Sequence, residues 1–238
     1  MRNDSIRRFF LAFAIQIVVA VAPCVAQAQA TSDPYPAMAP LDKYLISNKE
    51  SEIELARSAA PKSISESAEV MVLGPKGYTT VVKGNNGFLC LVERSWGAAT
   101  DDPEFWNPKV RSPICFNLSA RRSVVASYLL KTGLVLAGKS KTEIVRALAA
   151  ALDSKEVPGL EPGAMCYMMS KQQYLNDRGK SWHPHLMFFV QGDAAGSWGA
   201  NLEGSPVIAA NDPEERITIM MVWAGQWSDG TPAPIMEH

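Results

Sequence analysis

Strand patterns that precede and follow a central pair of helical patterns place this chain in the α+β class. Three strand patterns come early and are separated by turns rich in glycine and asparagine, so they predict a three-stranded antiparallel meander. Three short apolar runs near the end predict buried strands. We therefore expect a mainly antiparallel sheet with the helical pair packed on it. The predicted strands are Glu69–Leu73, Tyr78–Lys83, Gly87–Glu93, Ala164–Ser170, His185–Val190 and Ile217–Ala224.

Apolar residues at helical spacing predict the first helix of the central pair at Ser119–Leu136. The second helix begins at Ser140–Glu143, where the hydroxyl and the carboxylate fit a capping box. A shorter helix near the start is capped by Asn48 or Ser51 and runs to about Ala59.

The first thirty residues have the order of a secretory signal. Three arginines precede the apolar run Phe9–Val21, and small residues then place cleavage after Ala28 or Ala30. The apolar run is shorter than the ~20 residues that a stable membrane span needs. We expect residues 1–30 to be removed, 31–48 to form an extended lead-in and 49–238 to form a single domain.

Two export routes fit the leader. Arg7-Arg8-Phe9 resembles the start of a twin-arginine signal, but Ile6 stands where that motif has serine or threonine. We therefore favour the general secretory route, which leads to the periplasm or out of the cell.

The charge of the mature chain argues against nucleic acid as a partner. Without its leader the chain keeps 20 basic and 23 acidic side chains, a slightly acidic balance. No later apolar stretch is long enough to span a membrane. The expected partner is instead a small molecule or a component of the cell envelope.

Three cysteines remain after the leader is removed: Cys90, Cys115 and Cys166. An oxidising compartment favours one disulfide with one thiol left over. The alternative is three buried, unpaired cysteines, and spacing alone does not decide between these readings.

The tripeptide His183-Pro184-His185 is the main candidate for chemistry. In an extended chain both imidazoles lie on the same side and can bind Zn or Cu, with Glu93, Asp101, Asp102 or Cys166 as further ligands. His185 can also serve as a general base. In the simpler interpretation His185 enters the sheet with its ring hydrogen-bonded and His183 is exposed in a loop.

Common catalytic motifs are absent from the sequence. It contains no G-x-S-x-G, S-x-x-K or H-E-x-x-H pattern and no phosphate-binding P-loop. Whether the chain is an enzyme is therefore left open by its motifs.

Six tryptophans lie in or beside predicted loops and strand ends. Rings in such places can line a ligand cleft, and Trp96 and Trp182 are the candidates that we associate with ligand binding. The alternative is that these rings cover the ends of the core.

Several phrases resemble a group of uncharacterised secreted bacterial proteins: LARSAAPKSIS from Leu55, KGNNGFLCLV from Lys83, SPICFN from Ser112, HPHLMFFV from His183 and GSPVI from Gly204. The resemblance implies export, one shared fold and a Cys90–Cys115 disulfide. His185 matches the more regular histidine position of that group, and His183 matches less well. The resemblance implies no activity, because none is assigned to the group.

The leading hypothesis is an exported, non-enzymatic domain that binds a small ligand or serves the envelope. The ligand would lie at a loop-rich edge formed by Ser95–Asn117, Ser181–His185 and Trp198–Pro206. The alternatives are a periplasmic hydrolase with His185 or His183 as its base, and a metal-binding protein.

Overall fold

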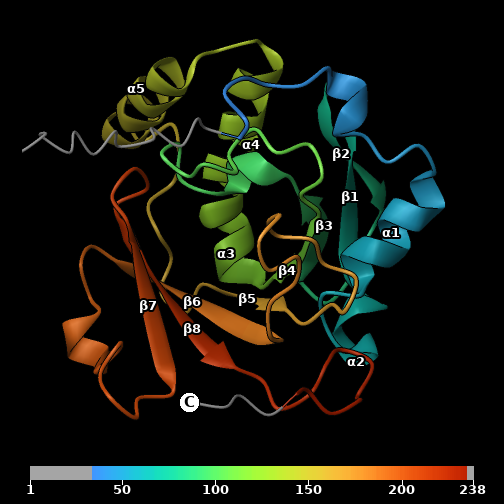
Figure 1. The fold of residues 1–238 in the computed structure, drawn as a ribbon, viewed down its shortest axis with the longest axis vertical. Helices are drawn as coiled ribbons and strands as arrows, with labels where there is room; N and C mark the ends of the chain where they lie inside the picture. The colour runs from blue at the N-terminus through green and yellow to red at the C-terminus, as the bar shows by residue number, and fades with distance from the viewer. Residues whose placement is uncertain (1–33, 235–238) are drawn as a thin grey trace, which may run out of the picture. The chain divides into compact units, whose positions relative to one another are not determined.

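A computed structural model describes residues 34–234, which contain one eight-stranded mixed sheet flanked by helices (Figure 1). The strand order is β2-β1-β3-β4-β5-β6-β8-β7, so the predicted α+β class is confirmed. β1 and β3 are parallel, and the other neighbouring strands are antiparallel. The strands are β1 (Glu69–Gly74), β2 (Gly77–Val82), β3 (Leu89–Glu93), β4 (Ser112–Phe116), β5 (Met165–Met168), β6 (His185–Gln191), β7 (Val207–Asp212) and β8 (Ile217–Trp223).

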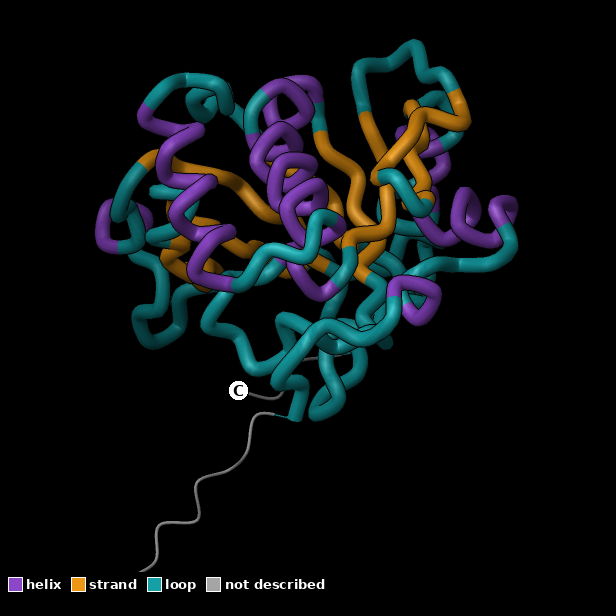
Figure 2. The backbone as a smooth tube through the Cα atoms, turned by 90° about the horizontal axis from the view of Figure 1, so that it is seen from above, coloured by secondary structure: helices purple, strands orange, loops and turns teal. Residues whose placement is uncertain are grey.

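Helices cover both faces of this sheet. α1 packs on β1, β3 and β4 from one side, whereas α3 and α4 pack on the other side and α5 packs on α4. Figure 2 shows these helices around the strands, with loops gathered at one edge of the layers. The helices are α1 (Lys49–Arg57), α2 (Lys62–Ser65), α3 (Leu118–Arg122), α4 (Val124–Leu136) and α5 (Lys141–Asp153), with 3-10 turns η1 (Leu41–Lys43), η2 (Ser95–Gly97) and η3 (Gly196–Trp198).

The alternation of side chains along each strand separates two cores. On the face toward α1, small and β-branched residues such as Val70 and Val92 pack with Ala56 of the helix. On the face toward α4, larger residues such as Leu91 and Phe116 pack with Tyr128. We call these the α1 face and the α4 face.

The predicted antiparallel meander is wrong in its third strand. β1 and β2 form the expected hairpin, but β3 lies on the other side of β1 and runs parallel to it. The crossing depends on Gly84, because a Cβ atom there would lie 2.1 Å from the backbone nitrogen of Glu69. Only glycine lets the chain pass this close to the start of β1.

The central helical pair is present, with a break that its periodicity did not predict. Ser123 has φ −120° and ψ −74°, and it divides the expected Ser119–Leu136 helix into α3 and α4. Its hydroxyl donates to the carbonyl of Ser119 at 2.7 Å. The predicted capping box is confirmed. At the start of α5 the Ser140 hydroxyl accepts from the amide of Glu143, and the Glu143 carboxylate accepts from the amide of Ser140.

The structure contains the Cys90–Cys115 disulfide implied by the resemblance. The two residues lie directly opposite each other on β3 and β4, with their Cα atoms 4.0 Å apart. Both side chains lie on the α1 face, in the core beneath α1. Cys166 is buried and unpaired. Burial, followed by the neighbouring Glu93, raises the pKa of its thiol well above the usual value.

Two strands of the sheet were not predicted from the sequence. β4 lies in the segment Ser95–Asn117, which was expected to be rich in loops, and its Pro113 interrupts the usual strand signal. Pro113 lies beyond the pairing of β4 with β5, which involves only Cys115 and Phe116. β7 pairs with β8 in the segment after Trp198–Pro206.

The segment before α1 is part of the fold from residue 34 onward. Tyr44 is fully buried, and its hydroxyl donates to the carbonyl of Trp106 at 2.8 Å. The predicted leader lies outside the described residues. Among residues 34–234, no helix has the length and apolar character needed to cross a membrane.

Candidate functional site

A cavity of about 390 Å³ lies on the α4 face of the sheet, beneath the segment that connects β3 to β4. β6 and β8 contribute His185, Met187 and Met221 to its wall. The connecting segment contributes residues from Arg94 to Ser112, and Trp182 adds an aromatic side chain. We call this space the outer cavity.

The strand register explains why these side chains meet. His185 of β6 lies opposite Met168 of β5 on one side and Trp223 of β8 on the other. Two residues further along β6, Met187 lies opposite Met221. Residues that are directly opposite share a face, so the α4 face carries His185 together with a cluster of methionines.

His185 is held as a neutral acceptor. Only 1 % of its surface is exposed, and burial lowers its pKa despite the hydrogen bond to His183. Nδ1 lies 2.7 Å from the carbonyl oxygen of His183. Because that oxygen only accepts, Nδ1 carries the proton and Nε2 presents a lone pair. Among the described residues Nε2 has no hydrogen-bond partner.

Aromatic rings surround this imidazole. The ring centroid of Trp182 lies 4.9 Å from His185 and 4.5 Å from Trp223, with edge-to-face geometry in both pairs. His183 contacts Trp223 from outside this group, with 5.6 Å between the ring centroids. The two histidines therefore contact the same indole, but only His185 lines the cavity.

Glu93 is the second titratable group of the outer cavity. It ends β3 opposite Ser112 and lines both this cavity and a smaller chamber behind it. Burial, followed by repulsion from Glu215, raises the pKa of Glu93 to about 8, whereas Lys131 opposes the shift. Its carboxyl has no hydrogen-bond partner among the described residues. At neutral pH it is therefore mostly a protonated acid.

The turn after β3 leaves space for that carboxyl. Gly97 of η2 lies against it, and a Cβ atom at this position would be 2.8 Å from Oε2 of Glu93. Any other residue would push the carboxyl out of its place. Gly97, Glu93, Met187 and Ile219 line both spaces, so the two are adjacent.

The smaller space, which we call the inner chamber, measures about 60 Å³ and has a buried ion pair beside it. Lys131 of α4 has no exposed side-chain surface, and its Nζ lies 3.3 Å from Oε1 of Glu215. Burial raises the pKa of Glu215 even though Lys131 opposes this. Asp212 lines the same chamber. Glu93 therefore faces acidic groups as well as one cation that is already paired.

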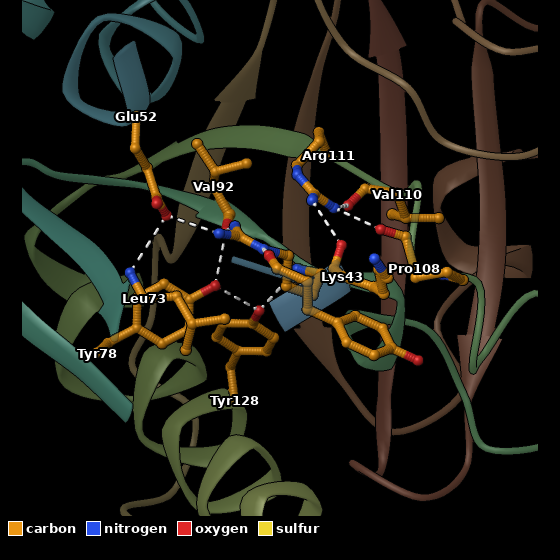
Figure 3. A network of polar contacts seen from close by, with 11 residues as sticks. Lys43, Glu52, Leu73, Tyr78, Val92, Pro108, Val110, Arg111 and Tyr128 are labelled. Atoms are coloured by element: carbon orange, nitrogen blue, oxygen red, sulfur yellow. Dashed lines mark hydrogen bonds and ion pairs between the residues drawn. The ribbon is translucent and has the colours of Figure 1, made fainter. Parts of the chain in front are cut away.

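A polar network fixes the backbone on both sides of Glu93 (Figure 3). The amide of Arg94 donates to the hydroxyl of Tyr128 at 2.9 Å, and the hydroxyls of Tyr128 and Tyr78 are 2.9 Å apart. The hydroxyl of Tyr78 donates to the carbonyl of Val92 at 2.6 Å. Tyr128 therefore donates to Tyr78, and one chain of hydrogen bonds connects residue 94 to residue 92.

The guanidinium of Arg94 belongs to the same network and is engaged by groups of the protein. It donates to Glu52 of α1 at 2.8 Å, to the carbonyl of Tyr44 at 2.7 Å and to the carbonyl of Val92. Glu52 also accepts from the amide of Leu73 at 3.2 Å. Both charged side chains are at most 1 % exposed. The pair joins α1 to the sheet and offers no free charge to a ligand.

The structure brings some of the predicted site residues together and separates others. Trp182, His185 and much of Ser95–Asn117 meet at the outer cavity. Trp96 is fully buried in the core, where its Nε1 donates to Thr132 at 3.0 Å. The Trp198–Pro206 segment covers the α1 face, because Trp198 packs on Phe188.

The described residues do not bring together the ligands that the predicted Zn or Cu site needs. Residues 34–234 contain no group of three or more His, Cys, Asp or Glu side chains that could hold a metal ion. His185 also uses Nδ1 in its bond to His183. Both histidine rings therefore lie near Trp223, but among residues 34–234 they do not form a metal site together with further ligands.

Sequence reasoning missed the charged groups near Glu93. Lys131 is a cation on the buried side of an apolar helix, and this placement is the signal that could have identified it. Glu215 comes from the turn between β7 and β8, where a run of acids is typical of a solvated surface. They meet only in the folded chain, where Lys131 of α4 reaches the turn between β7 and β8.

Two other cavities have fewer of the side chains that bind ligands or carry out catalysis. One of about 340 Å³ lies beside α1 and α2, and another of about 540 Å³ lies over α5. Neither contains a histidine, a cysteine or an aromatic ring. The outer cavity combines volume, aromatic walls, a buried histidine and a half-buried acid whose pKa is raised, which are features of ligand sites.

Comparisons of the chain with protein-family models, with curated proteins and with solved structures found no match. Its function must therefore be inferred from its own side chains.

Proposed function

We propose that this chain is an exported protein that binds a small organic molecule in the outer cavity. The observation that carries this proposal is a space of about 390 Å³ into which His185 and Glu93, both neutral at pH 7, project from an apolar sheet surface. Apolar walls with a few polar groups are the usual composition of small-molecule sites.

Binding is favoured over hydrolysis by the surroundings of His185. A histidine that activates a nucleophile is usually oriented by a carboxylate, whereas His185 is oriented by a backbone carbonyl. Ser95 of the cavity wall is also engaged structurally, because its hydroxyl donates to the carbonyl of Phe105 at 2.7 Å.

Methionine methyl groups provide a direct test of the proposed cavity. Protein with ¹³C-labelled methionine methyls would be titrated with a set of neutral, cationic and anionic fragments. We expect binding fragments to shift the signals of Met168, Met187 and Met221, which line the cavity. The signals of Met71 and Met165, which do not line it, are the internal controls. A set that leaves the three cavity signals unchanged would contradict the proposal.

A cavity-filling variant tests the same site independently. Met221→Trp places a larger ring in the outer cavity and should abolish the methyl shifts at Met168 and Met187. Val222→Trp is the matched control, because Val222 is the next residue of β8 and lies on the α1 face. Equal loss of binding in both variants would count against a site on the α4 face.

The proposal of export rests on the leader pattern and on the disulfide, which is typical of proteins that fold outside the cytosol. Mass spectrometry of the full chain expressed in a Gram-negative host tests it. We expect envelope fractions to contain protein that begins at Gln29 or Thr31. Full-length protein confined to the cytosol would contradict export.

A further inference from the structure

We infer that the ligand of the outer cavity is a small organic amine, whose ammonium group pairs with Glu93. This inference rests on the proposed function and names the chemical class of the ligand. It follows from the hydrogen-bonding character, the charge and the aromatic wall of the cavity.

Apart from Arg94, which is paired with Glu52, the titratable groups that line the cavity can all accept hydrogen bonds. Nε2 of His185 presents a lone pair, because Nδ1 carries the proton. The carboxyl of Glu93 has no partner among the residues that the structure describes. Asp102 and Glu104 line the cavity as well. The neutral side-chain donors beside them include Ser112, Asn176 and the indole N–H of Trp182. The four groups that can accept carry more acceptor sites than these side chains can satisfy, so a ligand rich in donors is favoured.

The charged side chains around the outer cavity also favour a cationic ligand. The cations near the site are already neutralised, because Arg94 is paired with Glu52 and Lys131 with Glu215. Glu93, Asp102 and Glu104 have no cationic side chain bound to them within the described chain. An anionic ligand would meet three acids, whereas a cation would relieve their repulsion.

The indole of Trp182 provides an apolar wall that tolerates positive charge. The ring faces of tryptophans attract ammonium groups, and the attraction strengthens when the cation is desolvated. Trp182 is held in place by its contacts with Trp223 and His185. An amine with an apolar body can thus place its carbon atoms among the methionines and its charge near Glu93.

Pairing with an ammonium group requires Glu93 to ionise. The groups around its carboxyl are Lys131, Tyr128, Tyr78, Glu215, Asp212 and Cys166. In the empty cavity the pKa of Glu93 is about 8, so an amine that binds at pH 7 displaces a proton. Affinity for an amine should therefore rise with pH through this pKa, until the amine itself loses its charge.

Three probes of similar shape test the inference: 2-phenylethylamine, 2-phenylethanol and 3-phenylpropanoate. Their dissociation constants would be measured by calorimetry from about pH 6 to about pH 8.5. We expect the amine to bind at least about tenfold more tightly than the alcohol at the upper pH, and the carboxylate to bind most weakly. Amine affinity should rise across this range, whereas alcohol affinity should not.

Glu93→Gln identifies the group responsible. Glutamine has nearly the same shape as the protonated acid, so we expect this variant to fold. It should weaken amine binding about tenfold, remove its pH dependence and leave alcohol binding within about twofold. Glu156→Gln, at an exposed position outside the cavity, is the matched control. Trp182→Leu supplies a second variant, which should weaken the amine more than the alcohol.

Several results would overturn the inference. Alcohol or carboxylate binding as tight as amine binding, or an unchanged amine affinity in Glu93→Gln, would exclude ammonium recognition while the cavity proposal stands. Failure of all three probes to bind would also overturn it. The broader fragment titration would then decide separately whether the cavity binds other molecules.

Discussion

His185 links the sequence motif to the physical behaviour of the site. Its side chain is buried on the α4 face, where one ring nitrogen is satisfied by a carbonyl and the other is available. Of the interpretations of the HPH motif, the simpler one had this ring enter the sheet and be hydrogen-bonded, as it does. Its neighbours Met168 and Trp223 come from β5 and β8, and only the register of the folded sheet defines them.

Replacing His185 with asparagine should change the pH dependence of stability. Below the ordinary histidine pKa of about 6.5, the unfolded chain binds a proton that the buried ring resists, because burial lowers the pKa of His185. The free energy of unfolding of the wild type should therefore decrease as pH falls from about 7 to about 5. In His185→Asn the side-chain amide can still donate to the His183 carbonyl, and this acid-sensitive contribution is removed.

Urea denaturation at several pH values measures this effect. At pH 7 we expect His185→Asn to lose about 1–3 kcal/mol of unfolding free energy, because it removes packed ring atoms. The difference from wild type should shrink toward pH 5. His183→Asn, which removes the partly exposed neighbour, is the control. A difference that stays constant at all pH values would show that His185 has the same pKa in the folded and unfolded states, which would contradict this account.

The pKa of Glu93 is a property that sequence patterns do not predict. Its position at the end of a predicted strand was evident, and it was considered as a metal ligand. Its raised pKa results from burial and from Glu215, which lies more than a hundred positions later in the chain. Long-range packing therefore determines its chemistry, and only the folded arrangement reveals it.

At the scale of elements, α1 is anchored by a buried ion pair. Arg94 leaves β3 and meets Glu52 of α1, and the amide of Leu73 on β1 donates to the same carboxylate. Helix and sheet are thus joined at one charged contact within an otherwise apolar interface. A pair of this kind is costly to break on one side only, because the remaining charge stays buried.

A double-mutant cycle tests this role. Glu52→Leu alone should lower the free energy of unfolding by about 3–5 kcal/mol, and Arg94→Met alone should have a similar effect. The double variant should recover much of that loss, because no unpaired charge remains. Chemical denaturation of all four proteins gives the coupling energy. Additive losses would mean that the two side chains contribute independently.

Local patterns predicted most elements, because turns, caps and apolar periodicity are properties of short segments. The Ser140 capping box and the Asn48 cap are both present. The position of β3 was not predicted, since the turn residues before it are compatible with a meander. Gly84 decides the outcome through its contact with the start of β1, which no local pattern specifies. β4 was missed because Pro113 lies inside a short strand.

At the scale of the whole molecule, the disulfide closes the junction between two parts of the sheet. β2, β1 and β3 lie on one side of it, and β4, β5, β6, β8 and β7 lie on the other. The segment that connects β3 to β4 forms one wall of the outer cavity. Because Cys90 and Cys115 join these two strands, the covalent bond also fixes the base of that wall.

Removing this bond should destabilise the whole fold. The cysteines are 25 positions apart, and a loop of this length corresponds to about 3.5 kcal/mol of unfolding free energy in the chain-entropy description. Cys90→Ala combined with Cys115→Ala should lose an amount of this order in urea denaturation. Cys166→Ala is the control, because its buried thiol forms no disulfide.

Thiol alkylation of the oxidised wild type distinguishes the three cysteines. Cys166 should resist modification in the native protein, because its thiol is buried and its pKa is raised. It should react once the chain unfolds, whereas Cys90 and Cys115 should react only after reduction. Because the disulfide spans the junction of the sheet, reduction should also increase proteolysis of the segment between β3 and β4. Fast alkylation of Cys166 in the native protein, or unchanged proteolysis after reduction, would contradict this account of how the two parts are held together.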